Sequence, residues 1–272
     1  MRSSITAATL LLIATTIAGC AGDPTIFGTL PPAQSHGNTP RPFDAPRTAR
    51  PNPDFHPPGV LGMRMLGAGS GFFIARNKFL TNFHVVRRCT AVTVGNNREG
   101  KEIMARYDYG DPQTDLAVLT TMPMDVTPAR FATSISADTA QDLSIVGYPA
   151  IGLPTLIAEL DRVAADPADL AQDLQLFPFS GSVHEGNSGS PVLNNKGAVV
   201  GIVTAKINTM RIFEATGMVI TDIGLAIPNR AVLDFLDQNA IAYLRADATN
   251  TLSPDQVLEE AHGFVRQVGC WG

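Results

Sequence analysis

The sequence predicts an all-β domain, organised as a sandwich or a barrel. Between Gly59 and about Arg245, apolar segments of strand length alternate with turns rich in Gly, Pro, Asn and Asp. This many short strands in about 190 residues is typical of a β-sandwich or β-barrel. The candidate strands are Gly71–Ile74, Lys78–Asn82, Ala91–Val94, Glu102–Arg106, Leu116–Thr120, Leu143–Val146, Thr155–Leu160, Asp173–Leu176, Pro191–Leu193, Ala198–Thr204 and Gly217–Ala226.

The composition narrows the class of protein. The chain has 272 residues, with 20 Lys and Arg against 25 Asp and Glu, and a formal charge of −5. A nucleic-acid-binding surface needs clustered basic residues, so this balance argues against a nucleic-acid partner. The three cysteines form no CxxC pair and there is no HExxH motif, which excludes the common zinc sites. We expect neither a metal nor another cofactor.

The first twenty residues are typical of a secretion signal that ends in a lipidation site. Arg2 precedes an apolar stretch that is too short to span a membrane. The closing residues IAGC resemble the lipobox of bacterial lipoproteins, in which the cysteine is acylated and becomes the mature N-terminus. The resemblance implies that residues 1–19 are removed and that Cys20 carries the acyl chains that anchor the protein. Because Ala21 rather than Asp follows, we expect the outer membrane of a cell envelope, facing the periplasm.

Residues 20–58 are predicted to form a linker behind the lipidated cysteine. Ten of the chain's twenty prolines lie in residues 21–58, and no apolar periodicity accompanies them. Such a segment cannot bury enough surface to offset the entropy lost on ordering. We therefore expect an extended tether between the membrane and the folded body.

Two cysteines other than Cys20 are available for a disulfide in an oxidising compartment. They are Cys89 and Cys270. A bridge between them would tie the C-terminal segment to the body, but two unrelated free thiols explain the sequence equally well. Both readings stay open, because spacing along a chain does not determine distance in the fold.

Two helices are predicted near the C-terminus. The first has Asn229 as its N-cap and an apolar face. The second opens with Ser253-Pro254-Asp255-Gln256, a capping box with proline at the first helical position. Its apolar stripe runs to Val268, with Gly269 suited to the C-terminal cap. These features divide the chain into a body at residues 59–246 and a helical clasp at residues 247–272.

Three short motifs carry candidate catalytic residues. TNFHVV places His84 after a predicted strand, DLAVL places Asp115 at the start of another, and GNSGSP places Ser188 in a turn. Each motif alone is common. Together they give the chain order His, Asp, Ser, in which a base next to a hydroxyl can take its proton and a carboxylate orients that base. Glycines beside the serine let backbone N–H groups turn toward a developing oxyanion.

With these motifs, the stretch from Gly69 to Pro228 resembles the protease domain of HtrA/Deg-type and related trypsin-like bacterial serine peptidases. The resemblance implies a double six-stranded β-barrel with the active site between the barrels. It makes His84 the general base, Asp115 its orienter and Ser188 the nucleophile, with the N–H groups of Gly186 and Ser188 as the oxyanion hole. The matching segments are GSGFFI, LTNFHVV, DLAVL, GYP, GNSGSPVLN, GIVTA and GLAIP.

The same resemblance predicts a substrate-binding segment. The residues at Val203, Thr204, Ala205 and Lys206 would pair with the substrate as an added strand and border the primary pocket. Ser182 would lie near the pocket floor, where it supplies no carboxylate and so disfavours a Lys or Arg preference. We expect a preference for small aliphatic residues, with acidic residues as the alternative, because the Lys206 ammonium suits an acidic side chain.

The sequence therefore predicts a serine endopeptidase of the bacterial cell envelope that acts on proteins or peptides. The alternative is a catalytically inactive pseudoprotease that binds extended peptides. The absence of a G-x-S-x-G elbow argues against an esterase. The residues after Arg245 are too few for the PDZ domain that HtrA/Deg proteins usually append.

Overall fold

The structure is a computed structural model that describes residues 58–96, 101–133, 142–151, 153–154, 158–166, 175–206, 222–246 and 250–272. The predicted signal segment at residues 1–19, the lipidation site at Cys20 and the linker up to residue 57 lie outside the described residues. The fold below is that of the body.

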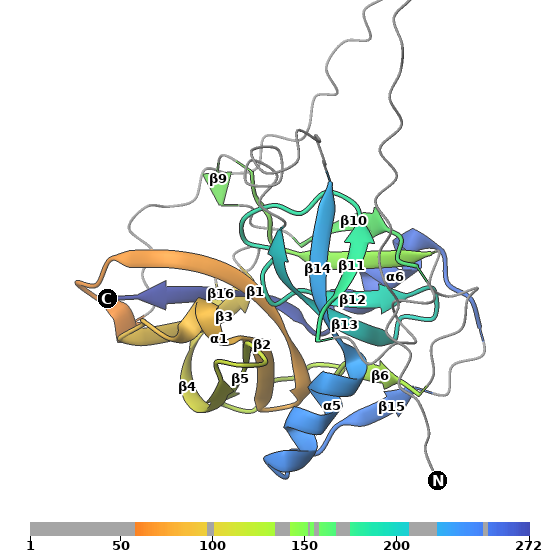
Figure 1. Cartoon of the computed structure of the whole chain (residues 1–272). Coiled ribbons are helices and arrows are strands. Elements are labelled where there is room, and N and C mark those ends of the chain that lie inside the picture. The colour runs from red at the N-terminus through yellow and green to blue at the C-terminus, as the bar shows by residue number, and fades with distance from the viewer. Residues whose placement is uncertain are drawn as a thin grey trace, which may run out of the picture. The chain divides into compact units, whose positions relative to one another are not determined.

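Six strands close into a first barrel. They are joined in the order β1-β16-β3-β4-β5-β2, with every neighbouring pair antiparallel (Figure 1). Apolar residues fill its interior; on β5, five of the six residues are buried. The strands are β1 (Met65–Ala75), β2 (Lys78–Asn82), β3 (Ala91–Asn96), β4 (Lys101–Asp111), β5 (Leu116–Thr121) and β16 (Val265–Trp271).

The C-terminal end of the chain corrects the sequence prediction. The capping box is confirmed, because the Ser253 side chain accepts from the Gln256 N–H and the Gln256 side chain accepts from the Ser253 N–H. Helix α6 (Pro254–Ala261) nevertheless ends at Ala261, so the predicted continuation of the helix to Val268 is wrong. Residues Val265–Trp271 form β16, which pairs with β1 on one side and β3 on the other. They complete the barrel and are not part of a helical clasp.

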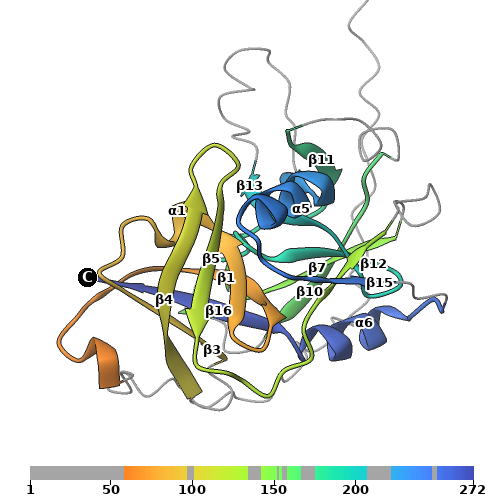
Figure 2. The same cartoon turned by 90° about the horizontal axis from the view of Figure 1, so that it is seen from below.

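A second sheet curls into the other half of the body. Its main path is β10-β7-β12-β13-β14-β11, and an isolated bridge between Ala164 and Ser180 joins its two ends. Together with the closed barrel this confirms the expected double β-barrel architecture (Figures 1 and 2). The strands are β10 (Glu159–Val163), β7 (Leu143–Gly147), β12 (Pro191–Asn194), β13 (Val199–Lys206), β14 (Ile223–Pro228) and β11 (Phe177–Ser180).

The remaining elements are short. Strand β15 (Leu244–Ala246) pairs in parallel with β6 (Arg130–Ala132), which joins β13, and β8 (Ala150–Ile151) pairs with β9 (Leu153–Pro154). In the described part of the chain, the helical elements besides α6 are η1 (Pro58–Val60), α1 (Phe83–Val86) and α5 (Asn229–Gln238). None of the described helices is long and apolar enough to cross a membrane.

Helix α5 begins one residue away from the predicted position. Pro228 is its N-cap and makes no side-chain cap bond, so the predicted capping role of Asn229 is wrong. The Asn229 side chain instead donates to the backbone carbonyl of Ala132. This bond ties the start of α5 to β6, and tertiary packing has replaced the local cap.

Most predicted strands match observed ones, and the exceptions have local causes. The predicted strands Thr155–Leu160 and Gly217–Ala226 fall partly outside the described residues. The C-terminal residues of the first lie in β10, and those of the second lie in β14. For Asp173–Leu176, residues 173 and 174 also fall outside, and residues 175 and 176 precede β11 without being part of it. Neither β6 nor β15 was predicted, since three residues are too few for a periodic pattern.

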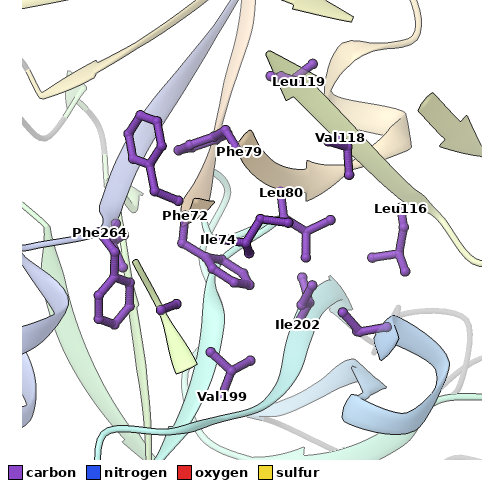
Figure 3. Close-up of a cluster of buried hydrophobic side chains, with 14 of the residues drawn as sticks. Phe72, Ile74, Phe79, Leu80, Leu116, Val118, Leu119, Val199, Ile202 and Phe264 are labelled. Carbon is purple, nitrogen blue, oxygen red and sulfur yellow. The ribbon is translucent and has the colours of Figure 1, made fainter. Parts of the chain in front are cut away.

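One apolar core continues from the first barrel into the second. Figure 3 shows Val199 and Ile202 of β13 beside side chains from β1, β2 and β5 such as Phe72 and Leu80. All four side chains are fully buried. Because burial of apolar surface is the main stabilising contribution in folding, this shared core holds the two barrels against each other. The predicted catalytic residues lie on segments that connect the strands of these barrels.

Candidate active site

His84 and Asp115 form a hydrogen-bonded pair on the first barrel. His84 lies on α1, directly after β2, and Asp115 directly precedes β5. The distance between His84 Nδ1 and Asp115 Oδ2 is 2.7 Å, and the His84 N–H donates to Asp115 Oδ1 at 2.9 Å. A carboxylate can only accept, so the ring proton is on Nδ1 and Nε2 is left with a free lone pair. The pair is arranged as a base and its orienter.

The backbone of Asp115 is held in an unusual conformation. Its φ of 57° lies in the left-handed region, which few residues other than glycine adopt. Its carbonyl accepts from the Phe83 N–H at 3.1 Å and from the Asn82 side chain at 3.0 Å. Asp115 is thus fixed to the segment that carries His84, and non-glycine residues with this backbone conformation are found preferentially at functional sites.

A residue of the second barrel completes the environment of Asp115. The Thr204 hydroxyl, on β13, donates to Asp115 Oδ2 at 2.5 Å. Partial burial opposes ionisation of Asp115, but the hydrogen bonds from His84 and Thr204 outweigh it and hold the pKa of the Asp115 carboxyl below its usual value. The carboxylate is therefore ionised at neutral pH and is placed to stabilise the positive charge that would form if His84 took up a proton.

Ser188 is presented by two successive turns. In the first, the Asn187 N–H donates to the His184 carbonyl, and Gly186 has a φ of 91°. In the second, the Ser190 N–H donates to the Asn187 carbonyl, and Gly189 has a φ of 87°. A positive φ at the third position is characteristic of a type II turn and favours glycine there. The GNSGS sequence therefore forms part of a double turn, and Ser188 is the second residue of the second turn.

The double turn is tied to the first barrel close to His84. The Ser188 carbonyl accepts from the Ser70 N–H at 2.8 Å. A methyl group on the neighbouring Gly69 would lie 2.8 Å from a Val85 side-chain carbon and 3.2 Å from that same Ser188 carbonyl oxygen. The residue after His84 and the predicted nucleophile thus pack on the same glycine. Among the described residues, no hydrogen bond joins the Ser188 hydroxyl to the His84 ring.

The two N–H groups expected to form the oxyanion hole have no backbone acceptor in the part of the chain that the structure describes. Neither Gly186 N nor Ser188 N donates to a backbone carbonyl there, whereas the amides of Asn187, Gly189 and Ser190 all do. Buried or half-buried N–H groups are nearly always paired in folded proteins. Two unpaired amides on either side of one residue are therefore suited to an external acceptor.

The predicted substrate-binding residues differ from one another in burial and in hydrogen bonding. Val203 is buried, and its N–H and carbonyl bond to Ser190 and Gly189, so no polar group of Val203 is free for a substrate strand. Thr204 uses its hydroxyl on Asp115. Ser182 is exposed. The backbones of Ala205 and Lys206 continue β13, while their side chains lie outside the described residues.

Cys89 and Cys270 are joined by a disulfide. Their Cα atoms are 5.1 Å apart, although the residues are 181 positions apart in the sequence. Cys89 follows α1, and Cys270 lies on β16, whose partners include β3. The bridge that the sequence left open is thus present, and it links the segment after His84 to the last strand of the barrel.

Three contacts that support the site were not predicted from the sequence. Thr204 was assigned to the substrate, and no role was given to Asn82, whose side chain holds the Asp115 carbonyl. No role was given either to Ser70, whose hydroxyl donates to the Gly186 carbonyl at 2.7 Å. These residues lie within the recognised segments TNFH, GIVTA and GSGF, but their partners are 33 to 116 positions away. No sequence spacing predicts such pairings.

Comparison with protein families identifies the class of the domain. Residues 69–202 match the family described as the trypsin-like peptidase domain. The match includes His84, Asp115 and Ser188. Residues 69–202 are therefore identified as a trypsin-like peptidase domain.

Curated relatives of HtrA and DegP type support this assignment. The chain is 34% identical over 173 residues to the putative serine protease HhoA of Synechocystis, covering 61% of this chain and 41% of that protein. It is 32% identical over 188 residues to a probable periplasmic serine endoprotease, DegP-like, of Rhizobium meliloti, covering 66% of this chain and 35% of that protein. The chain thus spans well under half the length of these relatives.

A solved structure shows the same fold. The crystal structure of the serine endoprotease from Yersinia pestis superposes with a TM-score of 0.52 at 22% sequence identity. The superposition covers 64% of this chain and 57% of the Yersinia chain. At this level of identity the similarity supports the double-barrel fold and no finer conclusion.

Proposed function

We propose that the chain is a serine endopeptidase that cleaves peptide bonds through an acyl-enzyme on Ser188. The observation that carries the proposal is the His84–Asp115 pair at 2.7 Å, on loops that pack against the double turn of Ser188. If the histidine, the aspartate and the turn serine had only structural roles, they would not need to lie close together. The match to the trypsin-like peptidase domain supports the same assignment.

The proposed chemistry follows from the proton positions. The Ser188 hydroxyl oxygen attacks the scissile carbonyl carbon while His84 Nε2 takes its proton, and Asp115 stabilises the resulting imidazolium. The oxyanion that forms is bound by the N–H groups of Gly186 and Ser188. His84 then gives the proton to the leaving amine as the carbon–nitrogen bond breaks. A water molecule, deprotonated by His84, releases the acyl group and restores Ser188.

A fluorophosphonate probe tests this proposal, because it labels only an activated serine. We expect the purified full-length chain to be labelled and to hydrolyse an unfolded protein substrate. Ser188→Ala should abolish both, and His84→Ala should reduce turnover by a factor on the order of 10⁶. Ser190→Ala is the matched control, since it removes a hydroxyl two positions along the same turn and should leave labelling intact. A folded wild-type chain without labelling or hydrolysis would overturn the proposal.

A binding role is the second candidate function. The specific observation in its favour is that no described hydrogen bond joins the Ser188 hydroxyl to His84. In uncomplexed serine hydrolases this contact is often long and tightens with substrate, so the observation does not outweigh the rest of the geometry. A pseudoprotease would bind extended peptides without cleaving them and would resist the fluorophosphonate probe. The same labelling experiment therefore separates the two functions.

We propose that the enzyme acts in the cell envelope. The lipobox-like sequence ending at Cys20 supports a lipid anchor, and the Cys89–Cys270 disulfide supports an oxidising compartment. A relative from Rhizobium meliloti is described as periplasmic. Metabolic labelling with a fatty-acid analogue should mark the wild-type chain and leave Cys20→Ser unmarked. Fractionation should recover the chain with the outer membrane.

We propose a preference for small aliphatic residues at the cleavage site, with an acidic preference as the competing outcome. The exposed Ser182 provides no carboxylate for a basic substrate side chain. Lys206 decides between the two outcomes by covering the pocket with its stem or by binding an acidic side chain. Cleavage of a peptide library by the wild-type chain and by Lys206→Ala distinguishes them. A strict Arg or Lys preference would contradict both.

A further inference from the structure

Ser70 is a buried serine that bonds to the nucleophile turn through its side chain. It lies on β1 and is inaccessible to solvent. Its hydroxyl donates to the Gly186 carbonyl at 2.7 Å and accepts from the Tyr148 N–H at 2.9 Å. The hydroxyl therefore joins three segments, β1, the end of β7 and the turn that carries Gly186, and both its donor and its acceptor capacity are used.

The backbone of Ser70 is fixed at the same place. Its N–H donates to the Ser188 carbonyl at 2.8 Å, and its carbonyl accepts from the Thr81 hydroxyl at 2.7 Å. Thr81 lies on β2 and is fully buried. Ser70 thus bonds to Gly186 through its hydroxyl and to Ser188 through its amide. These are the two residues whose N–H groups are proposed to form the oxyanion hole.

Gly186 needs an external restraint to hold its orientation. Glycine has the widest conformational freedom of any residue, so its φ of 91° is not fixed by its own sterics. The peptide group after Gly186 is held at both ends: Ser70 binds its carbonyl, and the His184 carbonyl binds its N–H, which belongs to Asn187. With that plane fixed, the position of the Gly186 Cα is fixed as well, and the Gly186 N–H can change direction only by rotation about the two backbone dihedral angles of Gly186. The Ser70 hydroxyl supplies one of these two restraints.

We propose that Ser70 is a positioning residue for the oxyanion hole. Its hydroxyl keeps the Gly186 turn in the conformation in which the Gly186 N–H faces the reacting carbonyl. Ser70 does not touch the substrate and acts only through Gly186. The proposal rests on the proposed peptidase function for its catalytic consequence. The structural part of the proposal is that the Ser70 hydroxyl holds the turn, and this part does not depend on the peptidase function.

A second buried serine offers a matched control. Ser190 is fully buried and lies against Gly147, the residue next to Tyr148, yet its hydroxyl has no hydrogen-bond partner in the described part of the chain. A methyl group built on Gly147 would approach the hydroxyl oxygens of both serines, so the two hydroxyls flank one glycine. Ser190→Ala removes the same atom type at the same depth without removing a bond. It controls for the general effect of a small buried cavity.

Steady-state kinetics test the catalytic consequence. In a comparable enzyme, loss of one hydrogen-bond donor of the oxyanion hole lowers kcat by a factor on the order of 10² to 10³. Loss of a residue that only positions such a donor should lower kcat by less. We expect Ser70→Ala to lower kcat by about tenfold and to change KM by less than about twofold, with the pH dependence of kcat unchanged. Affinity for a peptide boronic acid, which forms an anionic tetrahedral adduct, should fall in parallel. Ser190→Ala should change none of these. Unchanged kcat and boronate affinity in Ser70→Ala would overturn the proposal.

A crystal structure of Ser70→Ala tests the structural content by itself. We expect the Gly186 carbonyl to leave its present position and φ at Gly186 to depart from 91°, while Ser190→Ala keeps the turn. An unchanged turn in Ser70→Ala would overturn the proposal. This measurement decides the matter even if the wild-type chain hydrolyses nothing, in which case the peptidase function alone fails. If Ser70→Ala does not fold, Ser70→Cys takes its place, because it fills the same space with a much weaker donor.

Discussion

Asp115 combines three tasks in one residue. Its carboxylate orients His84 and accepts from Thr204, and its carbonyl is bound by Asn82 and Phe83. The left-handed backbone, with a φ of 57°, allows the side chain and the carbonyl of one residue to reach the same neighbouring segment. Asp is among the few non-glycine residues that adopt this conformation at small cost. A substitution at this position therefore changes backbone strain and electrostatics together.

Comparison of Asp115→Asn with Asp115→Ala separates these two effects. Asn tolerates the left-handed region as Asp does, so Asp115→Asn should keep the fold and lower kcat by a factor on the order of 10⁴, because it favours the wrong His84 tautomer. Asp115→Ala should lose activity as well and also lose stability by about 1–3 kcal/mol, from backbone strain and from the lost hydrogen bonds of the carboxylate. Turnover and urea denaturation measure the two quantities. Equal stability of the two variants would contradict the role of the backbone conformation.

The lowered pKa of Asp115 predicts how its contribution to stability depends on pH. Burial opposes ionisation, but the bonds from His84 and Thr204 hold the pKa in the folded chain below the ordinary value of about 3.9. The folded state therefore favours the ionised carboxylate, and this contribution is present above about pH 4 and is lost as the pH falls through the folded value. The difference in unfolding free energy between wild type and Asp115→Asn should shrink as the pH falls from about 5 through the lowered pKa of the folded chain. A difference that grows toward acid would reverse the assigned sign.

At the scale of elements, the double turn at residues 184–190 depends on two glycines for different reasons. Gly186 has a positive φ and requires a restraint from Ser70. Gly189 also has a positive φ, and a Cβ at this position would collide with the Ser70 carbonyl oxygen and approach the Thr81 hydroxyl to 2.6 Å. The turn is thus in direct contact with the backbone of β1 and with the Thr81 side chain of β2. No side chain fits between them.

Gly189→Ala should therefore be strongly destabilising. Its left-handed conformation alone costs about 1–3 kcal/mol with a non-glycine residue, and the collision with Ser70 adds to this cost. Gly67→Ala on β1 is the matched control, because a Cβ there meets nothing within 4 Å and no left-handed backbone is involved. We expect a loss of thermal stability in Gly189→Ala and almost none in Gly67→Ala, measured by circular dichroism. Similar melting temperatures for the two variants would contradict the steric argument.

The strands were predictable where their pattern was local. Lys78–Asn82 was predicted at its observed bounds from its local sequence alone. Residues Val265–Trp271 were not, because Val265 and Val268 also fit the helical stripe that begins in α6. Their strand conformation is decided by β1 and β3, which provide backbone partners on both sides. Tertiary pairing here overrides a local periodicity.

At the scale of the whole molecule, the sequence predicted candidate residues for the site but not the contacts that hold them. His84, Asp115 and Ser188 were recognisable because short motifs in a fixed order carry them. The Thr204–Asp115 bond joins the two barrels across 89 positions, and the Ser70–Gly186 bond spans 116. Both bonds depend on how the barrels pack through their shared apolar core. Such contacts follow from the complete fold and have no local signature.

The Cys89–Cys270 disulfide ties this arrangement to the redox state of the surroundings. It joins the segment after α1, which carries His84, to the last strand of the first barrel. A cross-link that closes so long a loop removes much conformational freedom from the unfolded chain. The bridge therefore acts on the stability of the barrel as a whole. The stabilisation by the cross-link should be distinguishable from any stabilisation by the two cysteine side chains on their own.

Removal of the disulfide should lower the unfolding free energy by an amount typical of such bridges, about 2–4 kcal/mol, and by no more than about 5 kcal/mol for a loop of 181 positions. Cys89→Ala, Cys270→Ala and the double variant should lose the same amount, because each removes the one bridge. A reducing agent should destabilise the wild-type chain and leave the double variant unchanged. Calorimetry with and without reductant measures both effects. Additive losses in the two single variants would show that the cysteines stabilise the barrel as separate side chains, and the cross-link would then have no role in holding β16 in place.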